Sequence, residues 1–426
     1  TLFPKQKAHY LNILHAGWPG GLILGGLASY FMAGGAGAKP VPWQFQISLF
    51  LVPVVLYGLM MLGQRFPKSE ASSSGISYKD MLGELGLVGA AVICGLLALF
   101  FKSDLGLPPL AAAGIAAGLL AAFGAATGFR FGHLLLAALL IIQALVGYVE
   151  LGTDSWISKI TGTIMNSPAN GLLLFVYTSG LMFVLRFFAG PIVERISPLG
   201  LLAVSALFGA AGLTLLGNAQ GALMCVIAAT VYGIGKTFLW PTMLAVVSEQ
   251  FPKGGAITIG AAGGVGMLAA GLLGGPGIGF LQDQNASAKL RESSAAVYDR
   301  YKAPKENEFL WMKTVGLDGA KVGVLEDGGK EAQRALDLMQ RENAKPEAVT
   351  AQKGLVDWWN SSAGPEAAGD KPLVEGAGLF GGRQALKLTA FVPATMFACY
   401  ALLLAWFRSE EHTSELQSRV DISYAV

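Results

Sequence analysis

The chain has 426 residues, of which 53% are hydrophobic and only 14% are charged, and its formal net charge is +2. This composition excludes an ordinary soluble domain and is typical of a membrane protein with several spans. The near-neutral charge and the lack of basic tracts interleaved with aromatic residues give no indication of nucleic-acid binding.

Long apolar runs follow one another along the chain. A helix needs about 20 apolar residues to cross the roughly 30 Å hydrocarbon layer, where unpaired backbone groups are not tolerated. The sequence therefore predicts an all-α integral membrane protein with about ten transmembrane helices. In chain order, the predicted helices are 11–32, 43–63, 82–101, 108–128, 133–151, 170–189, 199–216, 221–247, 256–280 and 386–407.

The first helix follows the opening "TLFPKQKAHY" directly, without the pattern of a signal peptide, and we expect the chain to be a fragment. Pro19 lies in this helix, and further prolines lie in later ones. Each proline leaves a carbonyl one turn back without its helical donor, so we expect kinks or polar backbone there. These prolines are Pro19, Pro53, Pro241, Pro276 and Pro393.

Positive charges are unevenly distributed between the short loops. If the first helix starts inside, the outer loops hold only Lys39, Lys102 and Lys159. The asymmetry predicts that both ends of the bundle lie in the cytoplasm, with the protein multi-pass in the cell (inner) membrane. The inner loops then hold Lys5, Lys7, Arg65, Lys68, Lys79, Arg130, Arg195 and Lys253, and Arg186 lies close to the inner end of its own helix.

The fifth predicted helix, 133–151, ends beside two acidic residues. Glu150 and Asp154 in "YVELGTDSW" are four residues apart and so share one helical face. Two carboxylates at a helix end are compatible with acid–base chemistry, but a solvated outer rim of the bundle explains them as well.

The eighth predicted helix carries one charge, Lys236, near the middle of "CVIAATVYGIGKTFLWPTMLAVV". An unpaired ammonium at mid-bilayer costs at least about 2.5–3.5 kcal/mol, so we expect it to face a cavity or a partner. Tyr232 and Trp240, one turn away on either side, share its face. Gln143 is expected as a neighbour at the same depth, and a carboxylate partner is expected from helices outside this chain.

Between Gln282 and Gly382 the apolar runs stop and charged residues with helix formers take over. This segment is interpreted either as a loosely packed helical loop or as a cap that captures substrate or binds a partner. Its candidate packing residues are Phe309, Trp311, Trp358 and Trp359, with a narrow stripe of Ala332, Ala335, Leu336 and Met339.

The end of the chain changes abruptly after "CYALLLAWF". The string "RSEEHTSELQS" resembles the translation of a common sequencing-library adapter, so residues 408–426 are interpreted as an artefact without function. Cys94, Cys225 and Cys399 lie in separate spans without metal-ligand spacing, so we expect no disulfide, no metal site and no cofactor.

One loop carries a family resemblance. "RFFAGPIVERISPLG", residues 186–200, resembles the loop motif of the major facilitator superfamily through Gly190, Glu194 and Arg195. The strings "AHYLNILHAGWPGGLILGG", "GKTFLWPTML" and "SEQFPKGG" resemble the fifth and tenth helices of the branch that includes the fucose and glucose/galactose permeases.

The resemblance implies a partial bundle that lacks the first four helices of a twelve-helix core. Residues 1–63 would then end the N-terminal half, and 64–132 would be the central connection with an inserted helix pair. Residues 133–281 would be five helices of the C-terminal half, 282–385 an extracytoplasmic helical insertion, and 386–407 the last helix.

The implied function is secondary active transport of a small polar solute, a sugar above all, coupled to a proton or sodium ion, by a monomer that is not an enzyme. Glu194, with Gly190 and Arg195, would form a cytoplasmic gate near the start of the first helix, around His9 and Asn12. The alternatives are a membrane-embedded enzyme and a transporter of nucleosides or other metabolites. The candidate cavity residues are Lys236, Tyr232, Trp240, Gln143, Glu150, Asn12, His15 and Trp18.

Overall fold

The computed structural model describes residues 6–65 and 70–424. Almost all of these residues are helical, which confirms the predicted helical class, and two short strands form the one sheet in this part of the chain. Two compact units are distinguished: unit 1 is Thr1–Gly275 with Thr389–Val426, and unit 2 is Pro276–Leu388. Each is described by itself.

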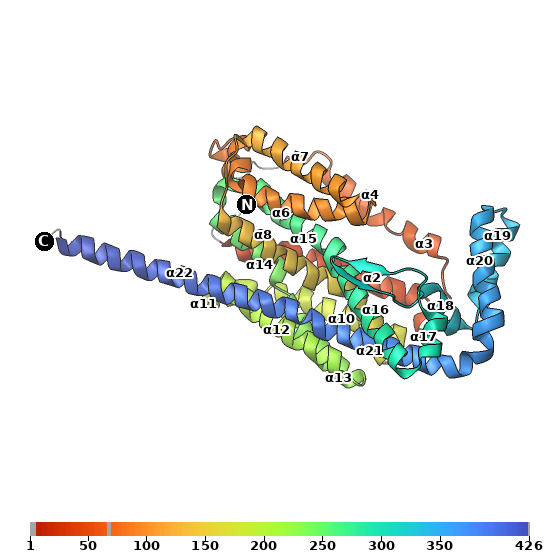
Figure 1. Ribbon diagram of the computed structural model, residues 1–426. Helices are drawn as coiled ribbons and strands as arrows, with labels where there is room; N and C mark the ends of the chain where they lie inside the picture. Colours follow the sequence, from red (N-terminus) through yellow and green to blue (C-terminus); the bar gives the residue numbers. More distant parts are fainter. Residues whose placement is uncertain (1–5, 66–69, 425–426) are drawn as a thin grey trace. The chain divides into compact units, whose positions relative to one another are not determined.

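Unit 1 is a bundle of long helices, in which α12 packs against α13 and α22, α8 against α15, and α10 against α2 and α9 (Figure 1). Its helices are α1 (Lys7–His15), α2 (Gly17–Met32), α3 (Trp43–Ser48), α4 (Leu51–Met61), α5 (Glu70–Ser73), α6 (Tyr78–Ser103), α7 (Pro109–Thr127), α8 (Leu134–Gly147), α9 (Thr153–Ile164), α10 (Pro168–Arg186), α11 (Ala189–Ile196), α12 (Pro198–Asn218), α13 (Ala222–Lys236), α14 (Leu239–Gln250), α15 (Gly255–Ala269) and α22 (Phe391–Tyr424). Two π-helical segments, η3 (Tyr148–Gly152) and η5 (Ala270–Gly274), and two 3-10 turns, η2 (Gly35–Gly37) and η4 (Pro252–Gly254), complete it.

Local sequence signals start several of these helices. Ser167 and Ser197 are N-caps whose hydroxyls accept hydrogen bonds from the amides of Asn170 and Gly200, each at 3.2 Å. Pro168 and Pro198 follow at the first helical position, where a missing N–H costs nothing. Hence α10 and α12 begin where the Ser-Pro pairs stand.

Nine helical segments of the described residues are long and apolar enough to cross a membrane, which indicates a multi-pass membrane protein. The first predicted helix, 11–32, is divided: α1 ends at His15 and α2 begins at Gly17. Pro19 lacks the N–H that would bond to the His15 carbonyl, so the helix is interrupted there. The remaining helix α2, with 16 residues, is too short by itself to cross the membrane. The predicted number of ten is corrected accordingly.

The fifth predicted helix is also longer than expected. Instead of ending at residue 151, the helical segment continues through η3 and α9 to Ile164. Glu150 and Asp154 therefore lie inside a membrane segment, not at a solvated rim. The predicted pair 82–101 and 108–128 corresponds to α6 and α7, which pack against each other.

Unit 2 contains a run of shorter helices and one antiparallel hairpin. Its elements are α16 (Gly275–Ser293), α17 (Ala295–Tyr301), β1 (Asn307–Phe309), β2 (Met312–Thr314), α18 (Gly319–Asp327), α19 (Lys330–Arg341), α20 (Pro346–Trp358), η6 (Trp359–Ala363), η7 (Gly364–Glu366) and α21 (Ala367–Thr389). Asn307 pairs with Thr314, and Phe309 pairs with Met312.

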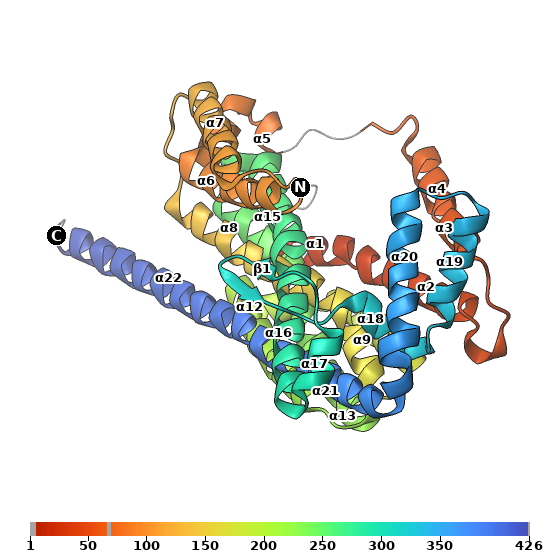
Figure 2. The ribbon, with the colours of Figure 1, turned by 45° about the vertical axis from the view of Figure 1, so that its right-hand side comes forward.

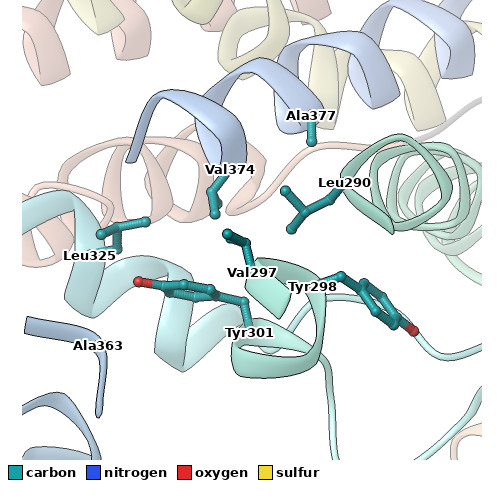
Figure 3. Packing of buried hydrophobic residues seen from close by; sticks show 8 residues of the cluster. All are labelled: Leu290, Val297, Tyr298, Tyr301, Leu325, Ala363, Val374 and Ala377. Atoms are coloured by element: carbon teal, nitrogen blue, oxygen red, sulfur yellow. The ribbon is translucent and has the colours of Figure 1, made fainter. Parts of the chain in front are cut away.

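Two small apolar cores hold unit 2 together. Figure 3 shows the larger one, in which Val297 of α17 lies between side chains of α16 and α21, with Tyr301 and Leu325 of α18 to one side. The second contains Ala332 and Leu336 of the predicted stripe, and Trp358 and Trp359 pack against both. The segment is thus a folded unit rather than a loosely packed loop.

Some sequence-based expectations concern residues outside those described. Lys5, Lys68 and the last two residues of the predicted artefact, 425 and 426, belong to this group. The helix α22 covers the predicted last span, 386–407, from Phe391 onward and continues to Tyr424.

Candidate functional site

Two interrupted helices of unit 1 provide free backbone groups. Pro19 leaves the His15 carbonyl without a helical donor, and Pro241 does the same for the Thr237 carbonyl, four residues earlier in each case. The second interruption separates α13, which ends at Lys236, from α14, which begins at Leu239. A kink or polar backbone was predicted at both prolines, and at both positions a side chain donates to the freed carbonyl.

That donor is Arg186, the last residue of α10, whose side chain is 1% exposed. Its Nε donates to the Thr237 carbonyl at 2.9 Å, and its Nη1 donates to the His15 carbonyl. Its Nη2 forms an ion pair with Glu150 Oε1 at 2.8 Å. The guanidinium thereby joins three helical segments, since five donors in a fixed fork suit several acceptors at once.

Glu150 lies on the π-helical segment η3 and is 2% exposed. Besides Arg186, its carboxylate accepts a hydrogen bond from the Trp240 amide, in the first turn of α14, at 3.0 Å. The first amides of a helix have no partner within that helix and carry a partial positive charge. The interruption at Thr237 therefore supplies a carbonyl to Arg186 and an amide to Glu150.

Lys236 is fully buried, at 0% exposure, and forms an ion pair with Asp154 of α9. Its ammonium also lies 5.5 Å from the ring centroid of Tyr232 and 5.9 Å from that of Phe175. This overturns the expectation of a carboxylate partner from outside the chain. The partner was missed because Asp154 was placed beyond the end of its helix.

Tyr232, one turn before Lys236, connects the lysine to the π-helical segment. Its hydroxyl donates to the Val149 carbonyl at 2.7 Å and is hydrogen-bonded to Thr153. Residues 149 and 153 flank Glu150, so the two ion pairs are connected through η3. π-helical turns often mark functional positions because they turn carbonyls away from the regular ladder.

The four charges balance, with two carboxylates and two cations. Removing an isolated charge from water costs several kcal/mol, and only a well-placed partner with further hydrogen bonds offsets it. The network meets this condition for Glu150 and Arg186. Asp154 Oδ2, by contrast, is buried without a hydrogen-bond partner among the described residues.

Other predicted cavity residues lie in the same bundle. Asn12 is buried and donates to Thr242 Oγ1 at 3.1 Å, but its Oδ1 has no described partner. Gln143 is buried with neither amide atom paired among the described residues. Trp240 and Gln143 both lie over Gly266, where an added Cβ would meet the Trp240 ring at 2.7 Å and Gln143 Nε2 at 2.9 Å.

The side chains of two predicted cavity residues, His15 and Trp18, lie outside the buried network. The His15 side chain donates from Nδ1 to the Leu11 carbonyl of its own helix at 2.8 Å, and only its backbone joins the network. Trp18 is 49% exposed, and the structure gives it no contact with the buried charges.

The predicted gate residues lie on α11, which packs against α1. The Gly190 amide donates to His9 Nδ1 at 3.1 Å, and an added Cβ at Gly190 would come within 2.7 Å of the same atom. Glu194 and Arg195 are exposed, and neither side chain has a hydrogen bond among the described residues. Of the three predicted gate residues, only Gly190 forms a hydrogen bond to α1 among the described residues.

Comparisons of this chain with protein-family models, with curated proteins and with solved structures find no match. Function is therefore inferred from the residues of the site itself.

Proposed function

We propose that the protein is a secondary active transporter of the major facilitator type, which moves a small polar solute across the cell membrane by alternating access. The observation that carries the proposal is the buried network of Glu150, Asp154, Arg186 and Lys236 at interrupted membrane helices. Broken helices whose free carbonyls and amides face ionic groups are the construction that alternating-access transporters use for their binding sites. Intramembrane ionisable residues also mark solute and ion pathways.

A sugar is the proposed solute class. Among the candidate cavity residues and the charged network, the buried atoms without described partners are Gln143 Oε1 and Nε2, Asn12 Oδ1 and Asp154 Oδ2, a mixture of acceptors and a donor. Hydroxyl groups both donate and accept, so a neutral polyol would satisfy all of them. The indole of Trp240 next to Gln143 adds an apolar face of the kind that binding pockets use for orientation. Nucleosides share part of this chemistry and are the second class to test.

Coupling to a proton or sodium ion follows from the pairing of the charges. Either ion competes with Lys236 for the carboxylate of Asp154, which has one unpartnered oxygen. Loss of this ion pair would weaken the connection between α9 and α13. Such a bistable contact is what a coupled transporter needs, because each bound species must favour one conformation over another. We also propose Gly190, Glu194 and Arg195 as the cytoplasmic gate beside α1.

The test is solute counterflow with the purified protein in lipid vesicles. A panel of radiolabelled hexoses, pentoses and nucleosides is measured with and without proton or sodium gradients. Lys236→Met should abolish the counterflow, because the remaining Asp154 carboxylate can no longer alternate between the ammonium and the coupling ion. Lys159→Met, at an exposed lysine on the same helical segment as Asp154, is the matched control and should retain it.

Unchanged uptake and affinity in Lys236→Met, with normal yield and helix content, would remove the lysine from the site. Chemical turnover of a solute without its movement across the vesicle membrane would favour the membrane-embedded enzyme instead.

A further inference from the structure

The hairpin of unit 2 has an apolar tip. β1 and β2 are joined by Leu310 and Trp311, so that Phe309, Leu310, Trp311 and Met312 stand together at its end. Trp311 is 81% exposed, and Leu310 adopts a left-handed backbone conformation with φ +56°. Turns of this kind favour Asn or Gly, because a side chain in the left-handed region costs about 1–2 kcal/mol. Two large apolar residues stand here instead.

Contacts with α16 hold the hairpin at both ends of β1. Asp283 of α16 holds the base of the hairpin: its Oδ2 accepts from Asn307 Nδ2 at 3.2 Å, and its Oδ1 accepts from the Leu317 amide at 2.8 Å. At the other end of β1, the Phe309 ring lies 5.8 Å from the ring of Phe280, centroid to centroid. From the base of the hairpin to the end of β1, the contacts on α16 therefore change from residue 283 to residue 280. Figure 2 shows the hairpin beside α16.

Residues 280–283 are also the place where an apolar membrane segment ends. No charged residue occurs between Lys253 and Asp283, and Phe280 and Leu281 are the last members of the apolar run. A membrane helix leaves the hydrocarbon layer where such a run ends, with aromatic residues at the boundary. The Phe280–Phe309 contact thus places the end of β1 at this boundary, and the next residue of the tip follows within roughly 3 Å along the strand.

We propose that the tip residues Phe309–Met312 form an interfacial anchor that inserts into the lipid headgroup region of the bilayer. Tryptophan prefers this region because its indole has an apolar body and one N–H donor. The charged residues of the hairpin lie closer to its base than the tip does. They are Lys305 and the exposed pair Lys313–Glu308, 3.9 Å apart, which would contact headgroups and water. The anchor fixes the hairpin, and with it unit 2, against the membrane surface.

Depth-dependent fluorescence quenching tests the anchor in the full chain. Trp311→Cys carries an environment-sensitive nitrobenzoxadiazole label, and Lys305→Cys, at an exposed position before β1, is the matched control. Wild-type protein treated in the same way gives the signal of Cys94, Cys225 and Cys399. In lipid nanodiscs, nitroxide-bearing lipid should quench the label at position 311 several-fold more than aqueous iodide does, with the reverse order at position 305.

A second measurement retains the native side chains. Brominated lipid should quench a larger fraction of the tryptophan emission in the wild type than in Trp311→Ser. Equal iodide quenching at positions 311 and 305 would overturn the proposal by placing the tip in water. Protection from both quenchers would also overturn it, because a protein surface would then cover the tip.

Discussion

Arg186 shows how one residue makes use of defects in neighbouring helices. A carbonyl that a proline leaves unpaired within a membrane is costly unless another donor reaches it. Arg186 reaches two such carbonyls, those of His15 and Thr237, and adds the ion pair with Glu150. Pro19, Pro241 and Arg186 therefore depend on one another, although they belong to three different spans.

A double-mutant cycle tests the buried Lys236–Asp154 pair. Asp154→Asn should lower the free energy of unfolding by about 3–5 kcal/mol, because it leaves a buried ammonium without its counter-charge. Adding Lys236→Met should recover most of this loss, since the double variant has no uncompensated charge. Thermal unfolding in detergent measures both changes. Asp299→Asn in the exposed pair with Lys302 is the control, and an Asp154→Asn loss no larger than this control would contradict the pairing.

The buried phenol of Tyr301 makes a second residue-scale prediction. Burial, and then the charge of Asp370, raise the pKa of Tyr301 to about 12. The neutral phenol therefore stabilises unit 2 below the ordinary tyrosine pKa of about 10, and this contribution is lost as the pH rises toward 12. The tyrosinate absorbance that disappears in Tyr301→Phe should titrate near pH 12. A difference signal that titrates near pH 10 would show an exposed phenol.

At the scale of elements, glycine sets how closely α8 and α15 approach. A Cβ on Gly147 would lie 2.0 Å from the Gly266 carbonyl oxygen, so two backbones meet here without side chains between them. Small residues that allow such contact are a usual basis of helix association in membranes. The glycine-rich sequence of residues 256–280 favours close packing of helices, but the neighbour of each glycine is known only from the structure.

Gly147→Ala should therefore destabilise unit 1, because the methyl group meets backbone that cannot move without shifting a helix. Gly264→Ala is the control on α15: nothing lies within 4 Å of its added Cβ, and alanine favours the helix by about 1 kcal/mol. Thermal unfolding should show a lower midpoint for the first variant and an unchanged or higher one for the second. Equal midpoints would contradict the close approach of α8 and α15.

Helix positions could be predicted from local sequence, whereas contacts between residues far apart in the sequence could not. The helix α10, Pro168–Arg186, was predicted as 170–189, because apolar length and a Ser-Pro start are local signals. Asp154 was placed beyond the outer end of its helix because the predicted apolar run stops at residue 151. Its burial depends on Lys236, 82 residues later, and no local pattern reports such a partner. Arg186 was placed near an inner loop for the same reason.

At the scale of the whole molecule, the charges of short loops orient the chain. Arg65, Lys79, Arg130 and Lys253 belong to the loops assigned to the cytoplasm, and the loops that alternate with them are poor in positive charge. The ion pair between Arg130 and Asp80, 2.8 Å long, brings two of the segments predicted to be cytoplasmic together at one end of α6. None of these loops involves residues 11–32, so the orientation of the later spans is independent of how the divided first helix lies.

The same alternation predicts that unit 2 lies on the side away from the cytoplasm, because it follows the span that begins after the loop with Lys253, which is predicted to be cytoplasmic. A cysteine at the exposed position Ser293 should therefore react with a membrane-impermeant maleimide in intact cells. Gln250→Cys, exposed at the end of α14 and close to Lys253, is the matched control and should react only after lysis. Wild-type protein gives the background of the three native cysteines. Labelling of Ser293→Cys that requires lysis, with Gln250→Cys labelled in intact cells, would invert the topology and place unit 2 in the cytoplasm.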